Sequence, residues 1–323
     1  MALQLYIKQS FWYILKLILS YLFFLIGGVY LLKLLFRNKK ALIILNYHNF
    51  SRYNNYKIKR GNILETDYAN NFEKQIRFLK NHFSFCYPEE FFYGNCNNGI
   101  NLLITFDDGY KDNFDIACPI LKKYEVSAIF FIATKALLDK DFLIHDKVRY
   151  LIQIGVVDKQ YGLVPALLNK GGGNYTESFI NEIEYKFKAY KPNQRLMLNA
   201  KELVEISNMG FKIGNHTHHH AGLSFLKYDE QIANILKCND IIQKLTSKKV
   251  DHLAFPNGLY NQETINIVKR IGIRFSYTIV GGINYPDDNP LVLKRIGVNA
   301  SDSIPVLITK LVTYLTIKRN KRN

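Results

Sequence analysis

The sequence predicts an α/β domain with a barrel-like sheet of parallel strands, preceded by an N-terminal transmembrane helix. Short apolar runs of strand length alternate with segments in which apolar residues recur at helical spacing. Acidic or histidine residues follow directly after several of the strand-like runs, where α/β folds place functional groups. The length of 323 residues is enough for one large α/β domain with a buried core.

The composition excludes a disordered chain and favours an anionic partner. Hydrophobic residues make up 48% of the chain and charged residues 22%, which is typical of folded proteins. The net charge of +16 favours a membrane or lipid phosphate as partner, and a solvated basic surface without a partner is the alternative. The sequence contains no nucleic-acid-binding motif, so no nucleic acid is expected as a partner.

The four cysteines do not have the spacing of a zinc ribbon or a redox motif. Cys118 and Cys238 lie in helix-like apolar patterns and are expected in the core. Cys86 and Cys96 flank an aromatic loop, so a disulfide between them is left open.

Residues 1–40 are expected to form a single-pass membrane anchor. No charged residue occurs from Leu17 to Leu32, and the apolar zone extends from Phe11 to Phe36, which is long enough to span a bilayer as a helix. A buried core helix and a cleaved signal peptide are the alternatives. We expect an uncleaved anchor in a bacterial inner (cytoplasmic) membrane, and basic residues on both sides leave the membrane face of the main domain open.

The first half of the domain shows a strand, helix, strand order. Residues 41–48 are an apolar run that ends in polar residues, as in a buried parallel strand. Residues 68–82 have apolar side chains near helical spacing, and 101–106 is a second buried strand that ends at Asp107 and Asp108. A helix closing at 119–124 and a strand at 127–133 repeat the order, which implies parallel pairing.

The pattern weakens over residues 137–197, which are expected to be an insertion covering one side of the site, with some helix around 177–190. Residues 199–209 form an amphipathic helix that begins at the cap residue Asn199 and ends at Gly210. The short strand 211–214 follows it.

The remaining chain continues the alternation and ends in a further helix. A helix is expected at 229–245, a strand and turn at 252–258, a helix at 262–271 and a strand at 275–279. Residues 301–323 contain an apolar helix and a basic tail; the helix either packs on the domain or lies on a membrane surface.

Two groups of residues have the chemistry of a hydrolytic metal site. His216 and His220 are four residues apart, a spacing at which two imidazoles can reach one ion. One carboxylate and water would complete such a site, and the pair Asp107–Asp108 offers two carboxylates at a strand end. His218 and His219 leave open which histidine pair is used.

These residues resemble motifs of the polysaccharide deacetylase family, the NodB-like enzymes of carbohydrate esterase family 4. The resemblance rests on Thr105–Gly109, Ile213–His220 and Ala254–Gly258, and it extends from about residue 41 to about residue 298 apart from the insertion. It implies a distorted (β/α) barrel, a divalent metal that is usually zinc, and removal of N- or O-acyl groups from sugars.

The resemblance also implies roles for individual residues. Asp108, His216 and His220 would be the metal ligands, and Asp107 would be the catalytic base. The backbone N–H of Tyr110 is expected to donate to the oxyanion of the tetrahedral intermediate.

The sequence departs from the family pattern at two places. Ala254 occupies the position at which the family usually has an arginine, and Arg295 is expected to serve as the partner of the base instead. The late Leu-x-His that usually supplies the general acid is not evident, so His48 and His145 are the acid candidates, with structural roles as the alternative. His252 is expected to be structural.

We therefore expect residues 41–300 to form a metal-dependent hydrolase that removes an acyl group, most simply N-acetyl, from an amino sugar. The expected substrate is an envelope polysaccharide or a lipid-linked glycan. A sugar-binding relative with weak or no activity is the first alternative, and a phosphohydrolase that uses the same ligands is the second.

Overall fold

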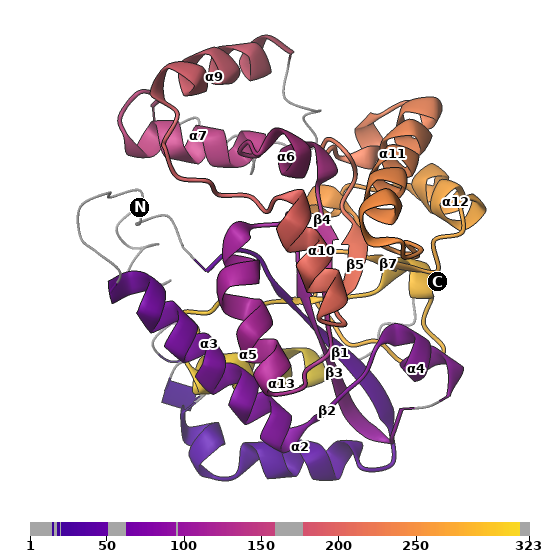
Figure 1. Ribbon diagram of the computed structural model, residues 1–323. Helices are drawn as coiled ribbons and strands as arrows, with labels where there is room; N and C mark the ends of the chain where they lie inside the picture. The colour runs from indigo at the N-terminus through magenta and orange to yellow at the C-terminus, as the bar shows by residue number, and fades with distance from the viewer. Residues whose placement is uncertain are drawn as a thin grey trace, which may run out of the picture.

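The computed structural model describes residues 15, 18–19, 21–50, 63–94, 96–158 and 177–316 (Figure 1). Its sheet has the strand order β7-β6-β5-β4-β3-β1-β8, with every pair parallel, and β2 pairs with β3 off this path. The strands are β1 Lys40–Tyr47, β2 Ser84–Phe85, β3 Gly99–Phe106, β4 Ala128–Ile132, β5 Lys212–Asn215, β6 His252–Ala254, β7 Phe275–Tyr277 and β8 Ile296–Gly297. The α-helices are α2 Gly28–Phe36, α3 Ile63–His82, α4 Pro88–Tyr93, α5 Cys118–Lys123, α6 Thr134–Asp139, α7 Ile144–Gln153, α9 Glu177–Tyr190, α10 Ala200–Asn208, α11 Tyr228–Thr246, α12 Gln262–Arg270 and α13 Ile304–Thr316.

The two ends of the curved sheet are joined by the segment that leads into β8. The N–H of Leu293 donates to the carbonyl of Ser276 at 2.8 Å, and the N–H of Thr278 donates to the carbonyl of Leu293 at 2.9 Å. Because β8 then pairs with β1, these bonds link the last strand of the sheet order back to the first. The sheet is therefore a distorted (β/α) barrel, as predicted.

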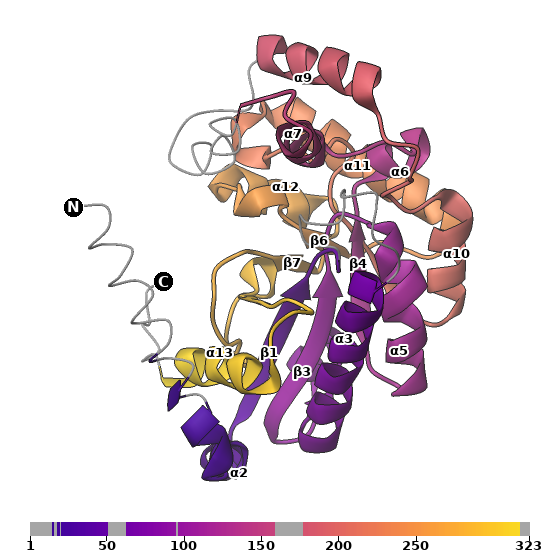
Figure 2. The ribbon, with the colours of Figure 1, turned by 90° about the vertical axis from the view of Figure 1, so that its left-hand side faces the viewer.

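Apolar side chains fill both faces of this sheet. One buried cluster combines residues of β1, β3, β4, β6 and β7 inside the barrel: Leu42, Ile44, Leu103, Ile129, Phe131, Ala254, Phe275 and Tyr277. A larger cluster lies between the sheet and the outer helices, and Figure 2 shows α3 and α5 beside β3 on this side. Because side chains on both faces of the strands are buried, the strands are almost continuously apolar in sequence.

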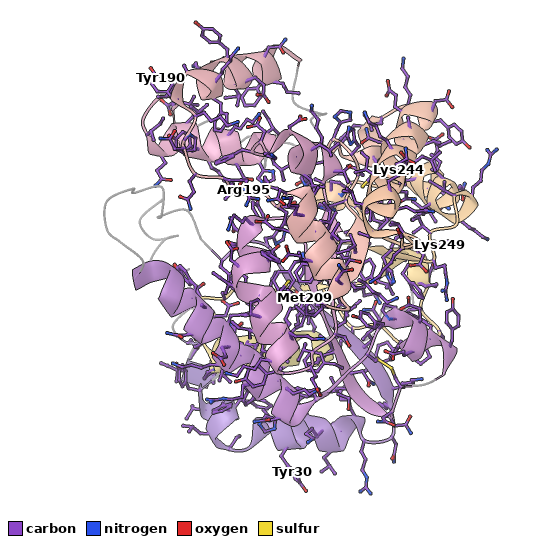
Figure 3. The ribbon with its side chains drawn as sticks, in the orientation of Figure 1. Tyr30, Tyr190, Arg195, Met209, Lys244 and Lys249 are labelled. Carbon is purple, nitrogen blue, oxygen red and sulfur yellow. A yellow bond between two sulfur atoms is a disulfide. The ribbon has the colours of Figure 1, made fainter. Side chains whose placement is uncertain are left out.

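The helices and strands predicted after residue 40 are confirmed, with ends that differ by a few residues. The Asn199 cap is confirmed as well, since its side chain accepts a hydrogen bond from the N–H of Glu202 at 3.0 Å. Arg195, labelled in Figure 3, holds the same helix start by donating to Glu202 through two hydrogen bonds of 2.6 Å. The short helices α4, α6 and α7 were not predicted.

The prediction of a membrane-spanning anchor, and of a membrane-anchored localisation with it, is wrong. Gly27 has a φ of 78°, which separates the turn of helix before it from α2. The nine residues of α2 span only about 14 Å at ~1.5 Å per residue, against about 30 Å for a bilayer core. Among the residues that the structure describes, no helix is long and apolar enough to cross a membrane; residues 1–14, 16, 17 and 20 of the predicted anchor lie outside them.

Helix α2 packs on the domain with one side only. Val29, Leu32 and Phe36 are buried in the outer core. Tyr30 is 74% exposed and points away from the body of the molecule (Figure 3). The apolar segment before β1 therefore contains a break between two helical stretches and a helix with one buried face, and neither feature can be inferred from its composition.

The C-terminal helix packs on the domain, and each cysteine is either a buried thiol or part of a disulfide. Helix α13 packs on the domain through Leu307, Ile308 and Leu311, while the basic tail lies outside the described residues. Cys118 and Cys238 are buried thiols, as predicted. The disulfide that the sequence left open, Cys86–Cys96, is present.

The insertion contributes α7 and α9, which lie beyond the end of the sheet toward which the strand arrows point (Figures 1 and 2). The two helices pack through their own apolar cluster, including Leu151, Ile183 and Phe187. Lys147 of α7 joins them by donating to Glu184 of α9 at 2.6 Å. This insertion places residues of α7 at the carboxyl ends of the strands.

Candidate active site

The acidic pair lies at the carboxyl end of β3, next to the ends of β1 and β4. The β1–β3 register pairs Tyr47 with Phe106, so the chain after each strand emerges at the same edge. Asp107 and Asp108 are each only 3% exposed. Two buried carboxylates need compensating charge or hydrogen bonds, and the side chains in closest contact differ between the two: His216 and His220 for Asp108, and Arg295 for Asp107.

Asp108 is surrounded by the predicted histidine ligands. Its Oδ1 lies 3.3 Å from Nε2 of His216 and 3.1 Å from Nε2 of His220, and the three ligand atoms lie within 4.8 Å of one another. Ligand atoms around a tetrahedral ion with bonds of about 2.0–2.1 Å are separated by about 3.3 Å. The observed spacing therefore fits a divalent ion such as zinc.

The orientation of His216 leaves its Nε2 available for this ion. Its Nδ1 lies 2.8 Å from the carbonyl oxygen of Ala254, which fixes the tautomer with the proton on Nδ1. Burial lowers the pKa of His216, but the contact with Asp108 and the charge of Asp107 more than offset this and raise the pKa above its usual value. In the same way, burial raises the pKa of Asp108, and the two histidines hold it well below the usual range.

The backbone around this cluster has unusual torsions at three positions. Asp108, Thr217 and His220 have φ angles of 78°, 61° and 54°. Such angles are unfavourable for residues with a side chain, and three of them fall within this one cluster and its loop. Hydrogen bonds hold the loop in place, because Asn215 Oδ1 accepts from the N–H of Thr217 at 2.7 Å and Thr217 Oγ1 accepts from the N–H of Ala221 at 3.1 Å.

The two other histidines of this loop do not join the cluster. Nδ1 of His218 lies 2.9 Å from the hydroxyl of Thr134, and His219 is exposed. The structure thus settles which histidines converge on Asp108.

Asp107 is held by Arg295 from inside the barrel. The guanidinium makes a bidentate pair, with NH1 donating to Oδ1 at 2.7 Å and NH2 donating to Oδ2 at 2.8 Å. Burial raises the pKa of Asp107, but the charges of Arg295 and His216 outweigh burial and lower the pKa below its usual value. Asp107 is therefore ionised at neutral pH and is not part of the Asp108 cluster.

His145 approaches the site from the insertion. Its Nε2 lies 3.9 Å from Oδ2 of Asp108 and 3.1 Å from the hydroxyl of Tyr110, which in turn donates to Asp146 at 3.0 Å. Burial holds the pKa of His145 well below its usual value, while burial raises the pKa of Asp146 to about 7. His145 and Tyr110 are thus joined in one hydrogen-bonded group beside Asp108.

His48 lies on the other side of the acidic pair. Its Nε2 is 3.9 Å from Oδ2 of Asp107, and its side chain is 52% exposed. His252 is far along the sheet from the pair: its Nε2 lies 3.0 Å from Glu89, and its Nδ1 lies 2.8 Å from the hydroxyl of Tyr277. The predicted site residues other than Arg295 therefore lie at the carboxyl end of the sheet, and Arg295 reaches Asp107 from inside the barrel. His252 has separate partners, in line with the structural role that was expected for it.

Sequence reasoning missed Asn46 and Asp146. Asn46 is a polar residue inside an otherwise apolar strand, and this could have indicated a function for it. Asp146 lies in a helix of the insertion that was not predicted, and its sequence carried no signal that connects it to Tyr110.

The fold and this cluster define an α/β-barrel protein with a candidate metal centre at the carboxyl end of its strands. Residues 94–276 match the family model described as polysaccharide deacetylase, which is more than half of the chain. The chain belongs to the polysaccharide deacetylase family.

Two curated proteins are similar to the chain in sequence, and one solved structure is similar in fold. A Bacillus subtilis protein named as a polysaccharide deacetylase is 22% identical over 61% of this chain and 51% of its own length, so the match spans about half of that relative. The poly-β-1,6-N-acetyl-D-glucosamine N-deacetylase of Staphylococcus aureus is 24% identical over 82% of this chain and 80% of its own length. A solved Streptococcus pyogenes deacetylase in complex with acetate has the same fold, with a TM-score of 0.58, 20% identity, and coverage of 85% of this chain and 98% of that one.

Proposed function

We propose that this protein is a metal-dependent deacetylase that removes the N-acetyl group from an amino sugar of an envelope polysaccharide. The observation that carries the proposal is that the two residues of the acidic pair, Asp107 and Asp108, have different closest partners, which we call the division of the pair. Asp108 meets His216 and His220 at distances that fit a zinc ion, whereas the adjacent Asp107 is held apart by Arg295. A metal-dependent hydrolase needs a metal site and a separate general base, and adjacent carboxylates with different closest partners can supply both.

In this proposal Asp107 removes a proton from the attacking water. Arg295 keeps the carboxylate ionised and fixed in orientation, so it can accept that proton without rearrangement. A zinc ion held by Asp108, His216 and His220 supplies the Lewis acidity that makes water a nucleophile near neutral pH. The backbone N–H of Tyr110, two residues after Asp108, is the proposed donor to the developing oxyanion.

The leaving amine needs a proton, and we propose that one of the two flanking histidines donates it. Burial holds the pKa of His145 well below its usual value, so in that role His145 would first take up the proton that Asp107 removes from water. His48 lies beside Asp107 and His145 lies beside Asp108, each at 3.9 Å. Replacing the acid with Ala should lower the rate on an N-acetyl sugar by about 10²-fold or more. Hydrolysis of para-nitrophenyl acetate, whose leaving group needs no proton, should change little. Measuring both substrates with His48→Ala and with His145→Ala shows which histidine is the general acid. Near-normal rates of both variants on the N-acetyl sugar would exclude both histidines from this role.

A polymer is favoured over a lipid-linked precursor as the substrate. The name of the Staphylococcus aureus relative specifies poly-β-1,6-linked N-acetylglucosamine, and we propose a related amino-sugar polymer for this chain. Helix α2 lies at the end of the sheet opposite to the insertion (Figure 1), so its exposed residues Tyr30, Leu31, Leu34 and Leu35 do not line the region of the acidic pair. We propose residues 41–300 as the catalytic unit, with residues 137–197 as an insertion on one side of the site and residues 301–323 as a terminal helix and tail.

The function is tested by acetate release from defined glycans. Metal-depleted protein, the same protein reloaded with zinc, and wild type are incubated with N-acetylglucosamine oligomers of different linkage. We expect acetate and free amines from the zinc-loaded protein only, seen by mass spectrometry as the loss of acetyl groups. Binding of the oligomers without acetate release would favour the inactive sugar-binding relative, and phosphate release from a sugar phosphate would favour a phosphohydrolase.

A further inference from the structure

Asn46 lies inside the barrel at the carboxyl end of β1, and both ends of its side-chain amide are used. Its Nδ2 donates to Oδ2 of Asp107 at 3.0 Å. Its Oδ1 accepts from NH1 of Arg295 at 3.0 Å and from the hydroxyl of Thr105 at 3.0 Å. The side chain is buried, with only 5% of the residue exposed.

The chemistry of these neighbours allows only one orientation of the amide. In the reverse orientation, the Nδ2 donor of Asn46 would face the N–H donors of Arg295, and its Oδ1 acceptor would face the carboxylate of Asp107. Neither contact could be a hydrogen bond. Asn46 therefore connects the guanidinium and the carboxylate by a second route, in addition to their direct bidentate pair.

The hydrogen bond from Asn46 occupies the second acceptor position of Oδ2 of Asp107. A carboxylate has about four lone-pair positions, two on each oxygen. Oδ2 of Asp107 accepts from both Arg295 and Asn46, whereas Oδ1 accepts from Arg295. Within the part of the chain that the structure describes, the donors from inside the barrel thus leave Oδ1 as the oxygen with an open position.

Arg295 itself needs support, because it crosses the interior from the start of β8. Its Nε donates to the carbonyl of Thr278 at 2.8 Å, and its guanidinium lies 5.8 Å from the ring of Phe131 and 5.9 Å from the ring of Tyr277. Arg295 is only 2% exposed. Thr278, the two rings and Asn46 therefore surround the guanidinium on the path to Asp107.

We propose that Asn46 is a positioning residue that fixes the orientation of the Asp107 carboxylate by donating to its Oδ2. The role of Asp107 as base rests on the proposed function, but the orienting contact does not. Without the amide, the carboxylate retains the arginine fork but loses the donor to the second position of Oδ2. A misplaced catalytic group can cost about 10²-fold in rate.

The test combines structure and kinetics in Asn46→Ala and Asn46→Asp. Asn46→Asp retains acceptors for Arg295 and Thr105 but replaces the donor facing Asp107 with a like charge, so it serves if Asn46→Ala does not fold. The matched control is Asn101→Ala, since Asn101 is a buried asparagine of β3 whose amide donates to the carbonyl of Asn97 at 3.0 Å. We expect both Asn46 variants to show a rotated Asp107 carboxylate in crystal structures, a kcat about 10²-fold lower, and unchanged KM and zinc content.

The crystal structures can be obtained without metal or substrate, so this result does not depend on the identity of the glycan. An Asp107 carboxylate with unchanged orientation in the Asn46 variants would overturn the inference, whatever the rate. A kcat within about twofold of the Asn101→Ala control would also overturn it. Failure of wild type to release acetate would count against the proposed function alone.

Discussion

Replacement of Asp107 by Asn is expected to lower kcat for deacetylation by about 10³-fold while divalent metal remains bound. Asn cannot accept the proton of the attacking water, which removes the general base. Asp107 is not part of the cluster of the proposed metal ligands Asp108, His216 and His220, so the geometry of that cluster should survive. The measurements are initial rates of acetate release and metal content by mass spectrometry of the purified variant.

The control for this prediction is Asp240→Asn, which removes an exposed carboxylate that pairs with Lys244 on α11. We expect this variant to retain wild-type kcat and metal content. If Asp107→Asn lost its metal, Asp107 would belong to the metal site and the division of the acidic pair would be wrong. A kcat near that of wild type would show that another group acts as the base.

The acidic pair and the histidines were predictable because their positions depend on local sequence. An apolar run that ends at Asp107–Asp108 places both at a strand end, and parallel strands bring their carboxyl ends to one edge. The run that becomes β5 delivers His216 to the same edge by the same rule. Only the choice of His216 and His220 over their neighbours needed the family resemblance.

The partners of the base were harder to predict because they depend on contacts across the barrel. Arg295 is separated from Asp107 by 188 residues, and its role was expected from the resemblance alone. Asn46 was missed because its function arises from bonds to two residues distant in sequence. Local patterns carry no information on such contacts.

The failed anchor prediction has a related cause. The apolar residues before β1 have the density of a membrane span, but the left-handed turn at Gly27 and the burial of Val29, Leu32 and Phe36 depend on the folded domain. Hydropathy measures how apolar a segment is, and it does not show which side of a short helix the domain covers.

Replacement of His220 by Ala is expected to weaken zinc binding by more than about 10²-fold, because even the loss of an outer-shell partner can cost 10–100-fold. His220 Nε2 is one of the three atoms that converge beside Asp108, at 3.1 Å from its Oδ1. His219→Ala is the matched control, since this adjacent imidazole is exposed and lies outside the cluster. Competition with a chelator measures the affinity, and thermal unfolding with and without zinc gives a readout independent of activity, because a ligand that binds the folded state raises Tm. We expect zinc to raise the Tm of wild type and His219→Ala but not that of His220→Ala at the same concentration. Equal zinc affinity in the two variants would remove His220 from the metal site and, with it, the geometric basis for a zinc-dependent reaction at Asp108.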